Sequence, residues 1–290
     1  MRPLPDFEPL PPLPLRRVAI DFDGVPFAWH PSRPRLSSVA NAVSWAAVVF
    51  EKRLCAAFRD ALPLVDDPHL RAECEAFIAQ EATHSRVHKA HVKALETLHP
   101  ELAPLMGELD ALADAHLSHR SLIERIAFGA TVEGWLAPLG RYLVAERDRL
   151  FAGADVRVTS LFLWHFSEEI EHRSTALRLY RHLRPRLGAP WHTRQRAALA
   201  TLRLSRAGAR LIGGRFRRVD SYVSGAPALP MGRPLLRLVR ETLASHRPGF
   251  DAGGDIAPAW SLEYLSRIQG GLGPVEALVG VGGRERSRVV

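Results

Sequence analysis

The feature that most constrains this chain is a set of glutamates placed inside apolar helix stripes. Residues three or four positions apart share one face of a helix. On four long helical segments, such a face is apolar except for a central carboxylate. A lone buried carboxylate costs several kcal/mol unless a cation or hydrogen bonds compensate it, so four directed at one interior require bound cations. These glutamates are Glu51, Glu81, Glu133 and Glu169.

Histidines accompany two of these glutamates at a fixed spacing. Glu81 and His84, and likewise Glu169 and His172, form Glu-x-x-His pairs. This spacing lets a carboxylate and an imidazole on one helix reach the same ion. Two such pairs, each preceded along the chain by a helix with a single glutamate, form the ligand set of a dinuclear metal centre in a helical bundle. The alternative, a set of interhelical ion pairs, is disfavoured because Lys and Arg are scarce on these faces.

A third pair with the same spacing, Glu96 and His99, directly precedes Pro100 at a helix end. We do not count it as part of the centre, because it does not lie in the middle of an apolar stripe.

Other polar residues on the same helices are expected to lie around the metal. His165 lies one turn before Glu169, and we favour it as a ligand over a role beside the ligands. His88 lies one turn after His84 and is expected to adjoin the ligands or a substrate pocket rather than to bind metal. Glu168 and Glu171 are expected to face the surface or to hydrogen-bond to a histidine. Three further histidines, His91, His116 and His119, are expected to face solvent.

The pattern predicts an all-α fold, a four-helix bundle with additional C-terminal helices. We expect an extended N-terminal arm over residues 1–35, a metal-binding helical domain over 36–250 and a partly irregular tail over 251–290. Proline and capping residues place the helix ends. The expected helices are 37–62, 67–98, 101–116, 118–151 with a kink at Pro138, 155–183, 191–211, 234–245 and 259–268.

Composition limits the class of protein. The 290 residues are 47% hydrophobic and 24% charged, which is typical of a globular chain. No apolar run approaches the length of a membrane span, and the proline-rich N-terminus lacks the apolar core of a signal peptide. The two cysteines, Cys55 and Cys74, fit a reducing compartment. A cytoplasmic location is therefore expected.

The chain is basic, with a net charge of +8, and eight arginines fall between Arg194 and Arg218. Such a stripe could bind nucleic acid, anionic lipid or an acidic substrate. We favour a solvated helix face, because no aromatic residues interleave for base stacking. No clear nucleic-acid or membrane partner is expected.

Four helical segments are distinctive, and a fifth segment, HRPGF, lies near the C-terminus. The four are FEKRLCAAFRDAL, FIAQEATHSRVHKAH, TVEGW and WHFSEEIEHRSTAL. These segments resemble a bacterial family described as predicted metal-dependent hydrolases, which looks ferritin-like. The resemblance covers about residues 15–250. One departure is Phe50, which stands where the family usually has glycine before the glutamate.

The triplet His165, Glu169 and His172 is also similar to the ligand pattern of the diiron arylamine N-oxygenases, which add a histidine to the usual ferritin-like set. This more distant resemblance implies seven metal ligands, namely Glu51, Glu81, His84, Glu133, His165, Glu169 and His172.

The leading hypothesis is a non-haem diiron oxygenase or oxidase that uses O2 to oxidise a small organic substrate, with a possible external electron donor. Iron is the expected metal; manganese or a mixed iron–manganese pair would accept the same ligands. A dinuclear metal-dependent hydrolase and a non-catalytic iron-binding protein are the alternatives, and a homodimer is possible. Aromatic residues expected to keep water from the centre are Trp45, Phe77, Trp135 and Phe162.

Overall fold

The computed structural model describes residues 13–223, 233–247, 250 and 257–285. Within these residues the chain is helical and contains no strand, which confirms the all-α prediction. The helices are α1 (Pro34–Ala61), α2 (Pro68–Leu98), α3 (Leu105–Leu117), α4 (Leu122–Ala145), α5 (Arg147–Leu150), α6 (Val156–Glu171), α7 (Thr175–Arg186), α8 (Thr193–Phe216), α9 (Arg233–Ala244), α10 (Ala259–Gln269) and α11 (Pro274–Glu285).

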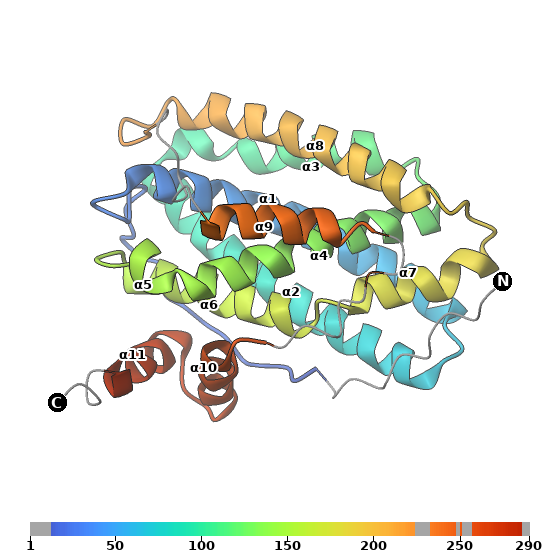
Figure 1. Ribbon diagram of the computed structural model, residues 1–290. Coiled ribbons are helices and arrows are strands. Elements are labelled where there is room, and N and C mark those ends of the chain that lie inside the picture. The colour runs from blue at the N-terminus through green and yellow to red at the C-terminus, as the bar shows by residue number, and fades with distance from the viewer. Residues whose placement is uncertain (1–12, 224–232, 248–249, 251–256, 286–290) are drawn as a thin grey trace.

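The central bundle consists of four long helical segments, namely α1, α2, α4, and α6 followed by α7 (Figure 1). α1 packs along α2, and α4 packs against both α6 and α7. α3 and α8 pack against each other and cover one side of the bundle. The arrangement is a helical bundle with additional helices, as the sequence pattern predicts.

Local sequence signals fix where these helices begin. Asp67 caps α2 by accepting hydrogen bonds from the backbone N–H groups of His69 and Leu70. Ser121 and Glu124 form a capping box at the start of α4. Asp155 caps α6 through the backbone N–H of Arg157. These side chains satisfy donors that the first helical turn leaves free.

The expected helix over 155–183 is wrong in one respect, because it is interrupted. α6 ends at Glu171 and α7 begins at Thr175. Ser174 and Thr175 are weak helix formers whose side chains compete for backbone groups. The Thr175 hydroxyl donates to Glu73 of α2 at 2.7 Å, and this contact holds the start of α7 against α2. His172 consequently lies at the break.

The expected helix over 118–151 also divides, into α4 and the short α5, although α4 continues through Pro138. α4 approaches α6 closely at Gly140. A Cβ atom at this position would lie 2.6 Å from the carbonyl oxygen of Phe166. Glycine is therefore required for the two helices to pack at this distance.

The C-terminal part is more helical than the sequence suggests. α10 is close to the expected helix, but α11 was not expected, because its glycines disfavour a helix. Both pack against α6. Tyr264 of α10 is fully buried and donates to the carbonyl oxygen of Pro274 at 3.0 Å. Tertiary packing therefore outweighs the low helix propensity.

Residues 13–33 contain no helix and run along the bundle. Their apolar side chains, including Val18, Phe22 and Val25, are buried. Trp29 donates to Asn41 of α1 at 2.9 Å. This N-terminal segment is thus part of the packed structure; residues 1–12 of the expected arm lie outside the described residues.

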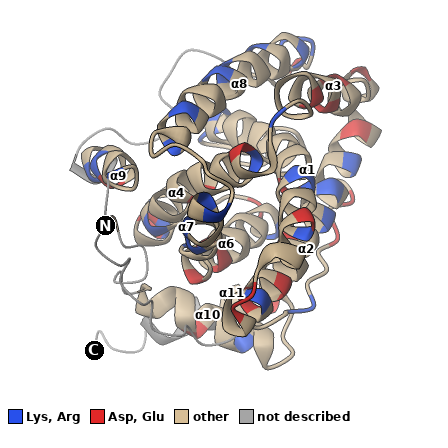
Figure 2. Cartoon of the chain, turned by 90° about the vertical axis from the view of Figure 1, so that its right-hand side faces the viewer, with Lys and Arg blue, Asp and Glu red and all other residues tan. Residues whose placement is uncertain are grey.

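The arginines of the basic stripe lie mainly on α8 (Figure 2). They are not uniformly solvated. Arg215 pairs with Glu108 of α3, and Arg194 is buried and donates to the backbone carbonyl of Ser245. Among the described helices, none combines the length and the hydropathy needed to cross a membrane.

Candidate metal centre

The four glutamates that the sequence pattern singles out lie in the core of the bundle. Glu51 comes from α1, Glu81 from α2, Glu133 from α4 and Glu169 from α6. Their exposed fractions are 5%, 1%, 1% and 0%. Carboxylates from four separate helices therefore share a dry interior.

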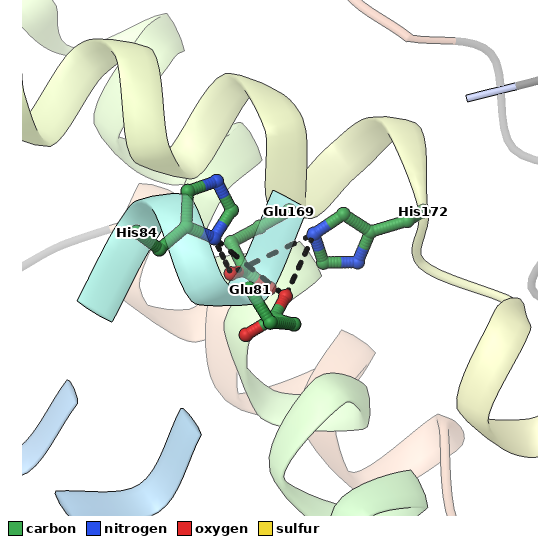
Figure 3. Close-up of side chains that lie close together, drawn as sticks. All are labelled: Glu81, His84, Glu169 and His172. Atoms are coloured by element: carbon green, nitrogen blue, oxygen red, sulfur yellow. Dashed lines mark ion pairs between the residues drawn. The ribbon is translucent and has the colours of Figure 1, made fainter. Parts of the chain in front are cut away.

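Two Glu-x-x-His pairs form the centre of the cluster (Figure 3). One ligand atom from each of Glu81, His84, Glu169 and His172 lies within 4.8 Å of all the others. Nδ1 of His84 is 3.6 Å from Oε1 of Glu81 and 3.6 Å from Oε1 of Glu169. Nε2 of His172 is 3.1 Å from Oε1 of Glu81. The spacing in the sequence thus places all four donors around one point.

A second group adjoins the first. Donor atoms of Glu51, His88 and His165 also lie within 4.8 Å of one another. His165 connects the groups, because its Nε2 is 2.7 Å from Oε1 of Glu169 and 3.5 Å from Oε1 of Glu51. Two groups of donors side by side are what a dinuclear site requires.

Glu133 completes the set from the α4 side. Its Oε2 lies 3.1 Å from Nδ1 of His172. All seven residues expected to bind metal are therefore brought together. His88, expected to adjoin them, also reaches the cluster, with its Nε2 2.7 Å from Nδ1 of His165.

Unsatisfied polar atoms test whether metal ions fit this cluster. Several of its buried atoms lack a hydrogen-bond partner within the described part of the chain, although such atoms cost free energy when left unpaired. Cations would supply the missing partners, and carboxylate with imidazole is a donor set that iron, manganese and zinc accept. The atoms are Oε2 of Glu51, Oε1 of Glu81, both carboxylate oxygens of Glu133, Oε2 of Glu169, Nδ1 of His84 and both ring nitrogens of His172.

The charges of the cluster lead to the same conclusion. Burial, and next the neighbouring carboxylate of Glu81, raise the pKa of Glu51 well above its ordinary value. Burial, and next the neighbouring carboxylate of Glu133, raise the pKa of Glu169 well above its ordinary value. Burial alone would also raise the pKa of Glu81, but contacts with His172 and His84 hold that pKa at about 2. Carboxylates that repel one another in a dry core are stabilised by bound cations, which would displace the protons.

Glu168 holds His84 in its orientation. Its Oε2 accepts from Nε2 of His84 at 2.8 Å, which leaves Nδ1 of that imidazole directed at the cluster. Its Oε1 accepts from Arg16 at 2.8 Å. Glu171 does not bind a histidine; it accepts from Arg16 and from Gln80. Sequence reasoning missed Arg16, because no local pattern relates it to α6.

The expectation for His91 is wrong. This histidine is fully buried, whereas His116 is half-buried and His119 is exposed. Nδ1 of His91 lies 2.9 Å from the hydroxyl of Ser44, which in turn lies 3.0 Å from Nδ1 of His88. His84, His88 and His91 are spaced by four and three residues and share a face of α2. This spacing could have predicted the burial.

An apolar cavity of about 190 Å³ adjoins the cluster. Glu51, Glu81, Glu133 and His165 are its ionisable lining residues, Thr201 and Ser205 add two hydroxyl groups, and the remaining lining residues are apolar. Trp135 lines this cavity. Phe77 and Phe162 instead contact His172 and His88, with ring centroids 4.8 Å and 5.6 Å apart. The centre is thus open to a small apolar space.

Trp45 lies away from the cluster. It is buried against Phe216 of α8, with ring centroids 5.5 Å apart. Of the four aromatic residues expected to keep water from the centre, Phe77, Phe162 and Trp135 lie beside the cluster or its cavity, and Trp45 is not among the residues that line that cavity.

The fold and the cluster together define a helical-bundle protein with a buried carboxylate–histidine centre of metal-binding type. The chain belongs to the predicted metal-dependent hydrolase family, whose family model matches residues 14–251. No curated protein and no solved structure matches the chain. The first resemblance seen in the sequence is thereby confirmed; the likeness to ferritin-like proteins and to N-oxygenases stays a prediction.

Proposed function

We propose that this protein is a dinuclear metal oxygenase or oxidase, with iron as the preferred metal. The observation that carries the proposal is the combination of seven buried carboxylate and imidazole donors with an apolar cavity directly beside them. Such a cavity would admit O2 and an apolar substrate while keeping bulk water away.

Each part of the chain has a distinct task in this proposal. Glu81, His84, Glu169 and His172 would hold metal together with Glu51, Glu133 and His165. When bound, two iron ions would supply the redox chemistry that activates O2. Glu168 orients His84, and the aromatic rings of Phe77 and Phe162 cover the histidines.

The overall reaction would insert one atom of O2 into a substrate bond and release the other as water. For a C–H bond, this consumes two electrons and two protons, and the electrons would come from an external donor. The substrate itself would lie in the apolar cavity, where it is held by contact and by exclusion of water.

A dinuclear hydrolase is the second candidate, and the family description favours it. Two metal ions can activate a water and bind a phosphate or ester oxygen. No Lys or Arg is among the residues that line the cavity at the cluster, so a strongly anionic substrate would find no positively charged side chain there. For this reason we place hydrolysis second.

Metal analysis and O2 reactivity separate these functions. Purified protein would be analysed for iron, manganese and zinc, then reduced without air and mixed with O2. About two iron ions per chain, a transient visible absorption band and consumption of O2 are expected. Iron that binds without consuming O2 would indicate a non-catalytic iron-binding protein. Turnover of generic esters or phosphates without O2, abolished by Glu81→Ala, would instead establish the hydrolase.

A further inference from the structure

A second and larger cavity, of about 430 Å³, lies between α1, α3 and α8. Its volume is in the range of ligand pockets. Its walls are almost wholly apolar, and small residues on α1 and α8 leave the space open. These small residues include Ala42, Ala46, Gly208, Ala209 and Gly213.

The large cavity adjoins the small cavity at the metal cluster. Both are lined by Val43, Ala46, Phe50 and Ser205. On α1 the lining residues recur every three or four positions from Arg35 to Glu51, so they form one face of that helix. Sixteen residues of α-helix extend about 24 Å. The two cavities therefore adjoin along this face of α1, from Arg35 to the metal cluster.

Arg35 contributes the single charged side chain among the residues that line the large cavity. Arg35 is half-buried, and its Nε has no hydrogen-bond partner in the described part of the chain. No carboxylate among the described residues forms an ion pair with it, whereas many other arginines of the bundle are paired. A buried guanidinium N–H without an acceptor is costly, and a carboxylate is the group that its geometry matches best.

We propose that these cavities bind a long, unbranched apolar molecule with a carboxylate head group, such as a fatty acid. The head group lies at Arg35, and the hydrocarbon tail runs along α1 past Ala46 towards Glu51. This proposal names the substrate class for the function proposed above, on which it rests, because it brings the end remote from the carboxylate to the metal cluster. A neutral hydrocarbon or a helix of another protein would not require the charge of Arg35.

Binding to metal-free protein tests this without any catalysis. Dodecanoate and 1-dodecanol would be titrated into the full chain, and their affinities measured by calorimetry. Dodecanoate should bind the more tightly. Arg35→Leu should weaken dodecanoate binding by at least about tenfold, the usual effect of losing a charged hydrogen bond, and should leave dodecanol binding within about twofold.

A matched control is Arg210→Leu. Arg210 is an exposed arginine of α8, on the helix that borders the cavity, but does not line it; its loss should change neither affinity. Ala46→Phe fills the space that the two cavities share, and should weaken both ligands. Thermal unfolding of each variant would establish that it is folded.

Two results would overturn the proposal. One is dodecanoate binding that Arg35→Leu leaves unchanged, and the other is failure of the wild-type protein to bind dodecanoate. Failure of this ligand proposal can be told apart from failure of the proposed oxygenase function. If the protein binds dodecanoate but cannot bind metal, the ligand class is supported and the oxygenase is rejected. If the metal-loaded protein reacts with O2 but does not bind dodecanoate, the oxygenase is supported and the ligand class is rejected.

Discussion

Arg16 and Glu168 form a buried ion pair across the bundle, with Nη1 and Oε1 2.8 Å apart and side chains that are 3% and 2% exposed. The other oxygen of Glu168 binds His84. The N-terminal segment is thereby connected to the metal cluster through a single carboxylate. A charge pair in such surroundings is costly to break, because the remaining partner stays buried and unpaired.

Arg16→Met should therefore destabilise the protein by about 3–5 kcal/mol. The substitution leaves Glu168 and Glu171 without their arginine and lets His84 lose its fixed orientation. The free energy of unfolding would be measured by urea denaturation in the presence of a chelator.

Arg17→Met provides the matched control, since Arg17 is exposed, and its effect should stay within about 0.5 kcal/mol. The double variant Arg16→Met, Glu168→Gln should be more stable than Arg16→Met alone, because no buried charge is left at position 168. Equal loss in both arginine variants would contradict the buried pair.

Loss of one Glu-x-x-His pair should strongly reduce metal binding. We expect Glu81→Ala with His84→Ala to reduce the metal content from about two ions per chain to below one, because both residues belong to the central group of donors. Metal content by mass spectrometry of the purified protein is the measurement.

The third pair in the chain is the natural comparison. Glu96→Ala with His99→Ala alters the same residue types at the same spacing, but these side chains are partly exposed and lie outside the cluster. Metal content should be unchanged. If both double variants retained metal, the ions would have to bind elsewhere.

Gly140→Ala should destabilise the bundle by about 1–3 kcal/mol, the usual cost of overpacking. The added methyl group would lie 2.6 Å from the carbonyl oxygen of Phe166, a backbone atom that cannot move without shifting α6.

Gly107→Ala in α3 should have the opposite effect on stability, because nothing lies within 4 Å of the added atom. It should stabilise the protein by about 0.5–1 kcal/mol. Thermal unfolding would compare the two.

His91 should make stability depend on pH. Burial lowers its pKa to about 3 from an ordinary value of 6.5. Below pH 6.5 the unfolded chain binds a proton that the folded protein does not, so stability falls as the pH falls from 6.5 towards 3. This residue should account for about 2 kcal/mol of the loss between pH 7 and pH 5.

In His91→Gln, the free energy of unfolding without metal should vary less over this interval. His119→Gln, at an exposed position, should behave as the wild type. A pH dependence that is unchanged in His91→Gln would show that His91 is accessible to protons in the folded state.

Both cysteines should be inert in the folded protein. Cys55 and Cys74 are 3% and 0% exposed, and burial raises the pKa of the Cys55 thiol to about 12 and that of Cys74 further still. The reactive thiolate is therefore almost absent at neutral pH. Iodoacetamide should modify neither cysteine in buffer and both in urea. Rapid modification of either one in buffer would indicate local opening of α1 or α2.

The sequence predicts the centre better than its surroundings. Glu51, Glu81, Glu133 and Glu169 can be found because carboxylates in apolar stripes are visible from helical periodicity alone. The break before Thr175 cannot be found in this way, since it depends on Glu73 of another helix. Arg16 is hidden for the same reason: it is separated from Glu168 by 152 positions.

The misplacement of His91 has a different origin. Its position relative to His84 and His88 is visible in the sequence, but a histidine without a carboxylate beside it gives no separate indication of burial. Similarly, the glycines of α11 disfavour a helix when considered alone, and only the packing against α6 accounts for it.

The course of residues 13–33 along the bundle has a practical consequence for anyone who shortens this chain. Truncation beyond Leu15 removes the guanidinium of Arg16 that neutralises Glu168, and removal of residues as far as Trp29 also uncovers Phe162 on the apolar side of α6. A fragment that begins at α1 would keep every glutamate and histidine of the cluster. It would nevertheless lack Arg16 beside Glu168 and Trp29 beside Phe162. Purification tags should therefore be added to the chain and should not replace residues 13–33.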